Sequence, residues 1–200
     1  MADAVRAGAE SRPKVPAVRV ALSFVYCESN LLDEAKAQFD RFAADGFDLP
    51  LDWNWVGAMV LLAEVCSALR DTRAAEVLYA KFQPLAEQVG VVAGLTRCDG
   101  SLGHPAGVLA ACLQRWEDAE RHFEHAVAMN DRLGARPAAV RTRRAYAAML
   151  LERNAPGDAE RAAALITAAL AETEQLDMPA EAAKLQRLRE RAGMIIGHGH

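Results

Sequence analysis

Long apolar runs are missing from this sequence, and no stretch approaches the roughly 18 to 20 residues that a membrane-spanning helix needs. The first residues, MADAVRAGAESRP, also lack the apolar core of a signal peptide. β-Branched residues are sparse and no long stretch alternates apolar with polar residues, which argues against a sheet. Alanine, leucine, glutamate and arginine dominate instead, and these residues favour helices. We therefore expect an all-α protein without a membrane partner.

The motifs of metal and nucleotide chemistry are also missing. The four cysteines are far apart and form neither a CxxC pair nor a Cys/His zinc pattern. The P-loop motif, GxxxxGKS or GxxxxGKT, does not occur. The sequence therefore predicts no catalytic residue, no cofactor and no metal site. It also predicts reduced cysteines, which are typical of a cytoplasmic protein.

The charge balance argues against nucleic acid as a direct partner. The 200-residue chain has a formal net charge of −4, so no global positive field attracts a phosphate backbone. Hydrophobic residues make up 52 % of the chain and charged residues 25 %, which allows an ordinary globular core. This length fits one sizeable domain or a short array of repeats.

Four segments share one pattern: a small residue, a large apolar residue four positions later, and an apolar or small residue three positions after that. Steps of four and three place all three residues on one face of a helix. The starting alanines are 40, 44 and 43 residues apart. The four triads are Ala35, Phe39 and Phe42; Ala75, Tyr79 and Phe82; Ala119, Phe123 and Ala126; and Ala162, Ile166 and Ala169.

A second apolar segment precedes each of these helices, and a short polar link joins the two. Because one helical hairpin cannot bury its apolar face alone, the pattern predicts stacked hairpins. We expect a right-handed α-α superhelix of about four hairpins, capped by a helix over residues 179–193, in one domain over 14–193. Flexible ends are expected at 1–13 and 194–200. The four first helices are expected over residues 15–28, 52–69, 105–114 and 137–152.

The repeat pattern resembles the tetratricopeptide repeat. The third unit matches that motif best, through Gly107, Trp116, Ala119, Phe123 and Ala126. The other units lack the tryptophan and leucine-glycine signature of the first helix, and their length exceeds the usual ~34 residues. The array is therefore expected to be a tetratricopeptide-like solenoid rather than a regular one.

A longer resemblance covers nearly the whole chain. Its most specific part is the run DRLGARPAAVRTR, followed by AYAAMLLERNAPGDAERA. These segments look like the C-terminal helical-repeat region of bacterial ATP-binding signalling regulators of the STAND/AAA type. Such regulators are linked to a class III adenylate/guanylate cyclase domain or to a LuxR-type DNA-binding domain. The resemblance implies a non-catalytic interaction and sensing arm, connected to an NTPase or effector domain in a parent protein.

Two histidines three positions apart raise the question of a metal or proton-transfer site. His122 and His125 lie in RWEDAERHFEHA, on a helix whose apolar face carries Phe123. Helical zinc pairs usually have a spacing of four, and no third ligand is specified by the sequence. We interpret both histidines as solvated or interhelical side chains.

The segment 90–105, GVVAGLTRCDGSLGHP, is longer than an ordinary link between repeats. Cys98, Asp99 and His104 suggest a nucleophile mechanism, but no further group completes one. The favoured interpretation is a mobile connector. The alternative that we retain is contact with a ligand or partner, for which Arg97 and His104 are the candidates.

Five arginines crowd the end of one predicted helix and the start of the next. First helices line the concave surface of tetratricopeptide-type arrays, and Arg141 and Arg144, three positions apart, can share that surface. A carboxylate, a phosphate or an acidic peptide is a suitable ligand for guanidinium groups. With Arg136, these two are our candidate contacts for an effector, and the alternative is a solvated face. The five arginines are Arg132, Arg136, Arg141, Arg143 and Arg144.

Two tryptophans lie close together in LPLDWNW, where Asp52 is a candidate cap for the following helix. Aromatic side chains are enriched at protein interfaces. We expect one of Trp53 and Trp55 to pack inward and the other to cover a hairpin edge or contact a partner.

The sequence thus favours a non-catalytic module that binds a protein segment or a small acidic effector and signals to a linked domain. A second hypothesis is an assembly module that forms a homodimer. A third is a small hydrolase that uses Cys98 or His104. The first hypothesis places function on the surface of the first helices, and the third places it in the segment 90–105.

Overall fold

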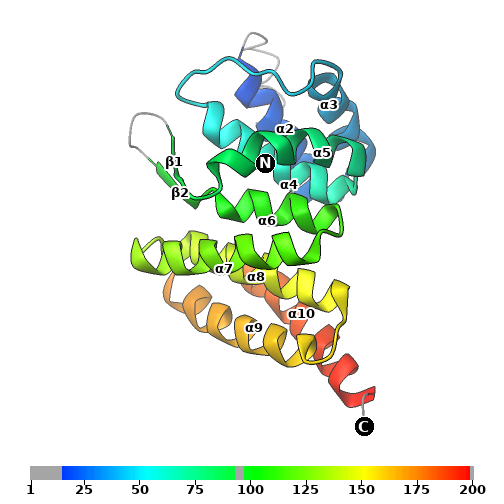
Figure 1. Cartoon of the computed structure of the whole chain (residues 1–200), viewed down its shortest axis with the longest axis vertical. Helices are drawn as coiled ribbons and strands as arrows, with labels where there is room; N and C mark the ends of the chain where they lie inside the picture. The colour runs from blue at the N-terminus through cyan, green and yellow to red at the C-terminus, as the bar shows by residue number, and fades with distance from the viewer. Residues whose placement is uncertain (1–14, 93–96, 199–200) are drawn as a thin grey trace.

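The structure, a computed structural model, describes residues 15–92 and 97–198, and nine α-helices make up most of that chain (Figure 1). The predicted helical class is therefore confirmed for the described residues, while the predicted segment 1–13 lies outside them. None of the described helices has the length and apolar character to cross a bilayer. The helices are α2 (Pro16–Glu28), α3 (Leu32–Ala44), α4 (Trp55–Leu69), α5 (Thr72–Phe82), α6 (Gly103–Cys112), α7 (Trp116–Arg132), α8 (Arg136–Arg153), α9 (Asp158–Gln175) and α10 (Pro179–His198).

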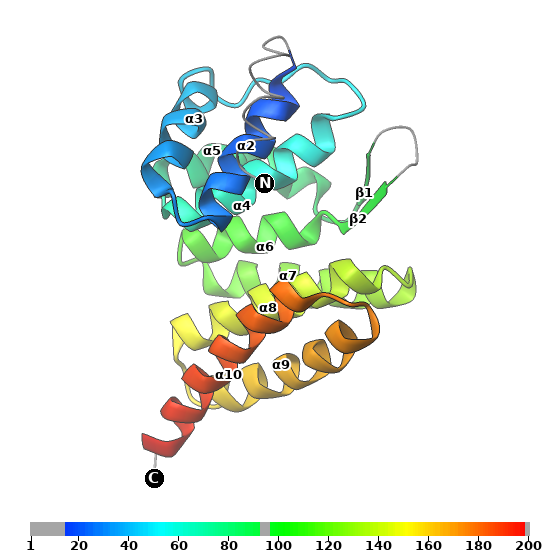
Figure 2. The same ribbon diagram turned by 180° about the vertical axis from the view of Figure 1, so that it is seen from behind.

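Consecutive helices pack in pairs, and the pairs stack from α2 at one end to α10 at the other (Figures 1 and 2). α2 packs on α3, α4 on α5, α6 on α7, and α8 on α9. The first helices also touch one another, because α4 contacts α2 and α6, and α8 contacts α6 and α10. The last helix, α10, continues past residue 193, where the sequence pattern placed its end.

The four triads lie on the second helices α3, α5, α7 and α9, and they face the core. Each starting alanine is fully buried, and the large residue four positions later is at most 3 % exposed. The small side chain allows the neighbouring helix to approach, and the large one fills the space beside it. Gly107 on α6 shows how close this approach is, because a Cβ there would lie 2.9 Å from the Phe123 ring.

Each first helix, and α9, is followed within two residues by a non-glycine residue with a left-handed backbone. Such residues close helices at little cost when their side chains are short and polar, as those of asparagine and aspartate are. This repeated geometry turns the chain back on itself within a few residues. The positions are Asn30, Arg70, Gln114, Asn154 and Asp177, with φ between 50° and 58°.

The segment between α5 and α6 differs from the prediction. A short 3-10 helix, η1 (Gln83–Leu85), is followed by two antiparallel strands, β1 (Val89–Val92) and β2 (Arg97–Ser101). The expectation that the chain contains no sheet is therefore wrong for the described part of this segment. α6 also begins at Gly103, two residues earlier than the sequence pattern placed it.

A buried asparagine explains why β2 is held in place. The Oδ1 atom of Asn130 accepts the backbone N–H of Ser101 at 2.8 Å, and its Nδ2 atom donates to Thr142 at 3.1 Å. Gly100, with a φ of +86°, lies against this amide, and a Cβ there would come within 2.5 Å of Oδ1. The contact joins residues far apart in the sequence, so no local pattern indicates it.

Candidate functional site

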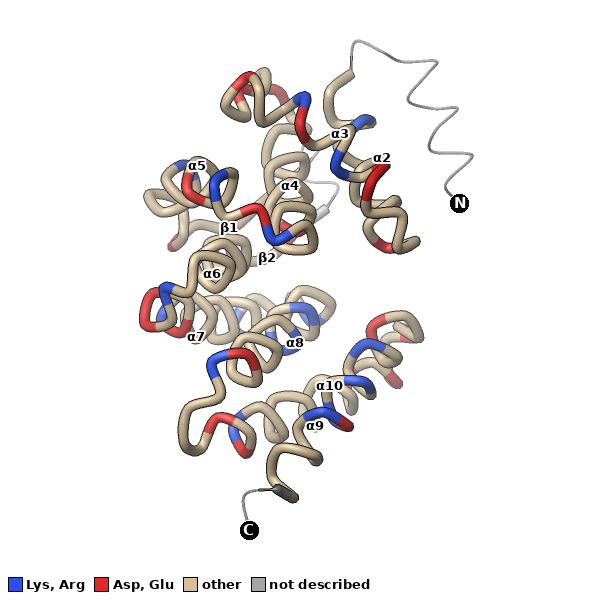
Figure 3. The backbone as a smooth tube through the Cα atoms, turned by 90° about the vertical axis from the view of Figure 1, so that its right-hand side faces the viewer, with Lys and Arg blue, Asp and Glu red and all other residues tan. Residues whose placement is uncertain are grey.

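A cavity of about 450 Å³ lies where the first helices face one another, and we call it the groove. Its wall includes Val60 and Glu64 on α4, Arg141 and Arg144 on α8, and Lys184 on α10. Helix α2 also contributes, although it lies at the opposite end of the stack from α10 (Figure 3). The groove therefore draws on both ends of the chain.

Two of these helices present one face each to the groove. Their lining residues recur at intervals of three and four, which is the spacing of a single helical face. The α4 row combines apolar side chains with one carboxylate, and the α8 row ends in two arginines. The rows are Gly57, Val60, Leu61 and Glu64 on α4, and Pro137, Arg141 and Arg144 on α8.

A carboxylate–imidazole pair lies in the groove wall. The Nε2 atom of His104 is 2.6 Å from the Oε1 atom of Glu64, and the two side chains are 9 % and 23 % exposed. Burial raises the pKa of the Glu64 carboxyl, but the hydrogen bond from His104 and the charges of His104, Arg144 and Arg141 outweigh it and lower this pKa to about 2. Glu64 is therefore ionised at neutral pH.

The cations of the groove differ in their pairing. The Nε atom of Arg144 donates to Glu181 at 2.7 Å, and the ammonium group of Lys184 contacts both carboxylate oxygens of Glu28 at 2.7 and 2.8 Å. Arg141 forms no hydrogen bond or ion pair with any residue of the described ranges. The groove thus contains one guanidinium group without a hydrogen bond or ion pair among the described residues, although its charge helps to lower the pKa of Glu64.

Three of the seven predicted contact residues, His104, Arg141 and Arg144, meet in the groove, whereas Arg136 lies outside it. Arg136 stands at the start of α8 and donates to Glu172 and Gln175 on α9, each at 2.6 Å.

Arg143, which belongs to the same cluster in the sequence, also forms an ion pair within the chain. It makes a two-pronged contact with Asp131, at 2.7 and 2.8 Å. Arg97 begins β2, and its side chain lies outside the described part of the structure. The five arginines that are close in the sequence therefore do not form one site. Only Arg141 and Arg144 line the groove.

The two tryptophans behave as the sequence predicts, but neither lines the groove. Trp55 is half-buried and packs against the core, while the Trp53 side chain is 76 % exposed. Asp52 accepts the backbone N–H of Asn54 at 2.8 Å, but the N-cap of α4 is Asn54, so the prediction that Asp52 caps this helix is wrong. Trp53 therefore remains a candidate for a separate contact surface.

Cys98 and His104 both line the groove, which brings the residues of the hydrolase hypothesis close to one another. No hydrogen bond joins the Cys98 thiol to the His104 ring, whose Nε2 atom is engaged by Glu64. A nucleophile needs a base within hydrogen-bonding reach. The geometry therefore provides no activated thiol.

His122 and His125 are not brought together as a site. The Nε2 atom of His122 is 3.1 Å from the hydroxyl of Tyr79, between α7 and α5, and burial lowers the pKa of this imidazole. His122 is thus an interhelical side chain, as expected. Among residues 15–92 and 97–198, no group of three or more His, Cys, Asp or Glu side chains has the arrangement to hold a metal ion.

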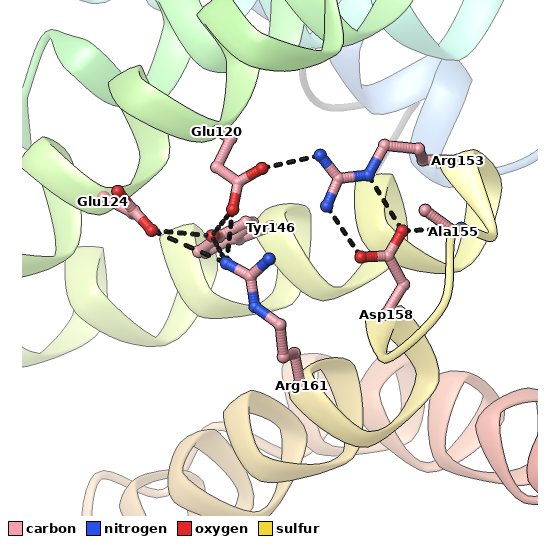
Figure 4. Close-up of polar contacts among 7 residues, drawn as sticks. All are labelled: Glu120, Glu124, Tyr146, Arg153, Ala155, Asp158 and Arg161. Atoms are coloured by element: carbon pink, nitrogen blue, oxygen red, sulfur yellow. Dashed lines mark hydrogen bonds and ion pairs between the residues drawn. The ribbon is translucent and has the colours of Figure 1, made fainter.

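A second polar cluster joins α7, α8 and α9, and we call it the network (Figure 4). Arg153 donates to both oxygens of Asp158 at 2.7 and 2.8 Å, and to Glu120 at 2.6 Å. Arg161 binds the same Glu120 and the hydroxyl of Tyr146. The Asp158 side chain is 3 % exposed, and it needs these donors because a buried charge without partners is costly. The network holds α9 on α7 and α8.

Sequence reasoning missed the glutamates and the lysine of the groove, Glu28, Glu64, Glu181 and Lys184. Glu64 has a signal in retrospect, because it is the only charged residue of α4, WVGAMVLLAEVCSAL. Lys184 and Glu28 have none, because they come together across 156 positions of the chain.

No family model, no curated protein and no solved structure matches the chain. The groove is therefore interpreted from its own geometry and charge. It combines a partly apolar wall with a carboxylate–imidazole pair and an arginine without a protein partner. This combination is typical of a ligand site, where a few polar groups orient a largely apolar ligand.

Proposed function

We propose that this chain is a non-catalytic, ligand-sensing module that binds a small acidic effector in the groove. Its stacked hairpins form a right-handed, tetratricopeptide-like α-α superhelix. The module is a cytoplasmic arm of a bacterial signalling or transcriptional regulator of the STAND/AAA type, and it passes effector occupancy to a linked NTPase or effector domain.

The observation that carries this proposal is the state of Arg141. A guanidinium group on the protein interior face of a helix normally finds a carboxylate, as Arg144 does with Glu181 at 2.7 Å. Arg141 lines the groove without such a partner in the described chain. An anionic ligand group would complete its hydrogen bonding, and charge-assisted bonds of this kind are roughly twice as strong as neutral ones.

A small effector fits the groove better than a protein segment does. The volume of about 450 Å³ lies within the roughly 300 to 1,000 Å³ of small-molecule sites. The ion pair between Lys184 and Glu28 joins α10 to α2 across the groove and would obstruct an extended chain.

The position of the groove supports a sensing role. It is bounded by α2 and α10, which belong to opposite ends of the stack, and by α4, α6 and α8 between them. A ligand that contacts all of these helices would favour one arrangement of the hairpins over others. A linked domain at either end would experience that change.

A thermal-shift screen of metabolite-sized acids tests the proposal, with two groove variants as controls. Val60→Trp places a large ring in the groove, and Arg141→Gln removes the guanidinium group. We expect at least one acid to raise the melting temperature of the wild-type chain by several degrees and neither variant to respond. The groove is not an effector site if every acid that stabilises the wild type stabilises both variants equally. The same conclusion follows if no acid stabilises the wild type.

A second function, assembly into a homodimer, is favoured by a different observation. Leu51 and Trp53 lie two positions apart, and their side chains are 86 % and 76 % exposed. Large exposed apolar residues are common in protein contacts. Light scattering over a concentration series tests this proposal, and we expect a dimer that is lost in the Leu51→Ser, Trp53→Ser double variant. A wild-type chain that stays monomeric throughout the series would exclude it.

A further inference from the structure

The α2 and α4 side of the groove is largely apolar but also carries the carboxylates Glu28 and Glu64, whereas the α8 side carries two arginines. Phe24 from α2 and Val60 and Leu61 from α4 contribute half-buried apolar surface. Arg141 and Arg144 lie on α8. A ligand that follows both sides needs an apolar body and a charged group at one end.

The charged groups of the groove allow one ligand anion and disfavour a second. Arg144 and Lys184 each form an ion pair with a carboxylate of the chain, whereas Arg141 forms no hydrogen bond or ion pair with any described residue. Glu64 is ionised, and Glu28 and Glu181 also line the cavity. A second anionic group on the ligand would therefore face carboxylates and be repelled.

A positively charged ligand is also disfavoured. The groove carboxylates Glu28, Glu64 and Glu181 already accept hydrogen bonds from Lys184, His104 and Arg144. Asp99 at the groove edge likewise has an interaction within the chain. An ammonium group would have to displace one of these partners, whereas a carboxylate at Arg141 displaces none.

We infer that the ligand is an amphipathic monocarboxylic acid, which binds with its carboxylate on Arg141 and its apolar body against Phe24, Val60 and Leu61. This inference rests on the proposed function, since it names the class of effector for the same groove. Arg141 supplies the selectivity for charge, and the α2 and α4 surface supplies the selectivity for chain length.

Four eight-carbon probes separate charge from shape: octanoate, octanedioate, octylamine and 1-octanol. We expect titration calorimetry at pH 7 to rank octanoate first, with the other three at least tenfold weaker. Hexanoate and butanoate extend the test to chain length. Each CH₂ removed from the acid should weaken binding about threefold to fourfold, which corresponds to ~0.8 kcal/mol of buried apolar surface.

Variants locate the two contacts. Arg141→Gln should weaken octanoate at least tenfold and leave 1-octanol unchanged, because it removes charge recognition alone. Leu61→Ser should weaken both probes and flatten the dependence on chain length. Arg136→Gln, an arginine of the same helix outside the groove, is the matched control and should bind octanoate like the wild type.

Several results would overturn this inference. The first is tighter binding of octanedioate or octylamine than of octanoate. The second is equal binding of octanoate to the wild type and to Arg141→Gln. The third is that none of the eight-carbon probes binds. The broader acid screen with Val60→Trp still decides the proposed function, because it detects any ligand of the groove. If the screen finds a polyanion that binds the wild type but not Val60→Trp, the groove is an effector site. The inference that its ligand is a monocarboxylic acid would then be wrong.

Discussion

Helix α8 contributes arginines to two regions of the molecule, and their contacts differ between the two. In the network, Arg153 is bound by Asp158 and Glu120, and its side chain is only 16 % exposed. In the groove, Arg141 of the same helix forms no hydrogen bond or ion pair with any described residue. The comparison separates an arginine that stabilises the fold from one that is available to a ligand. The two kinds of position should therefore respond differently to substitution.

The largest expected effect is the loss of the network arginine. Arg153→Met leaves Asp158 and Glu120 as buried or half-buried charges without their main donor, and removal of one partner of such a pair costs about 3 kcal/mol or more. Arg141→Met is the matched control on the same helix and should change the free energy of unfolding by less than about 0.5 kcal/mol. Urea unfolding monitored by circular dichroism measures both. Equal losses in the two variants would contradict the division between network and groove.

The next effect concerns the strand that borders the groove. Gly100→Ala combines a left-handed backbone with a Cβ that would lie 2.5 Å from the amide of Asn130, and we expect a loss of about 2 to 3 kcal/mol. Gly134→Ala is the control, because Gly134 also has a positive φ but has no atom within 4 Å of the added Cβ. It should lose only about 1 to 2 kcal/mol, which is the backbone cost alone. The added Cβ would also lie 2.6 Å from the Cβ of Ala138, so thermal unfolding of the two variants measures the cost of both close contacts, and identical losses would argue against such a cost.

Acid should weaken the groove wall through Glu64. The pKa of this carboxyl is lower in the folded chain than its ordinary value of 4.5, at about 2. The stability that it contributes is therefore present above pH 4.5 and is lost as the pH falls from 4.5 toward 2. Glu64→Gln should lower the free energy of unfolding at pH 7 by on the order of 2 kcal/mol, and this difference should disappear near pH 2. Urea unfolding at several pH values measures it, and a difference that is independent of pH would show that the charge of Glu64 is not responsible.

The smallest expected effect is at Arg136. Its side chain is 43 % exposed and pairs with Glu172 at the surface, and such pairs contribute little to stability. Arg136→Gln should change the free energy of unfolding by less than about 0.5 kcal/mol and leave effector binding unchanged. Parallel unfolding and binding measurements check both values. A loss of binding in this variant would extend the ligand site beyond the groove.

The helices and their pairing follow from local patterns in the sequence. The triads predict the second helices because residues three and four positions apart share a helical face whatever the rest of the fold does. Their alanines are fully buried, and Phe39, Phe123 and Ile166 are at most 1 % exposed. The strands β1 and β2 could not be predicted in this way, because β2 depends on Asn130, which lies 29 positions beyond Ser101.

The site was predictable only in part. Arg141 and Arg144 could be assigned to a concave surface, because their spacing and their place on a first helix indicate it. Arg136 belonged to the same cluster in the sequence, yet its contacts are with α9. Sequence position alone did not distinguish these residues, since all three are arginines of the same helix, α8. The residues that contact each arginine from other hairpins distinguished the groove arginines from Arg136.

The sequence by itself determined that the described chain folds into helices, where most of these helices begin and end, and which faces they bury. These properties depend on residues within one or two helical turns of each other, and the link inside each hairpin is short. Only the tertiary structure decided which charges are paired, because Glu64 with His104 and Glu28 with Lys184 are separated by 40 and 156 positions. The partners available to a charge are set by the way the hairpins stack. For the same reason, Arg141 could be recognised as unpaired only once every helix around the groove was in place.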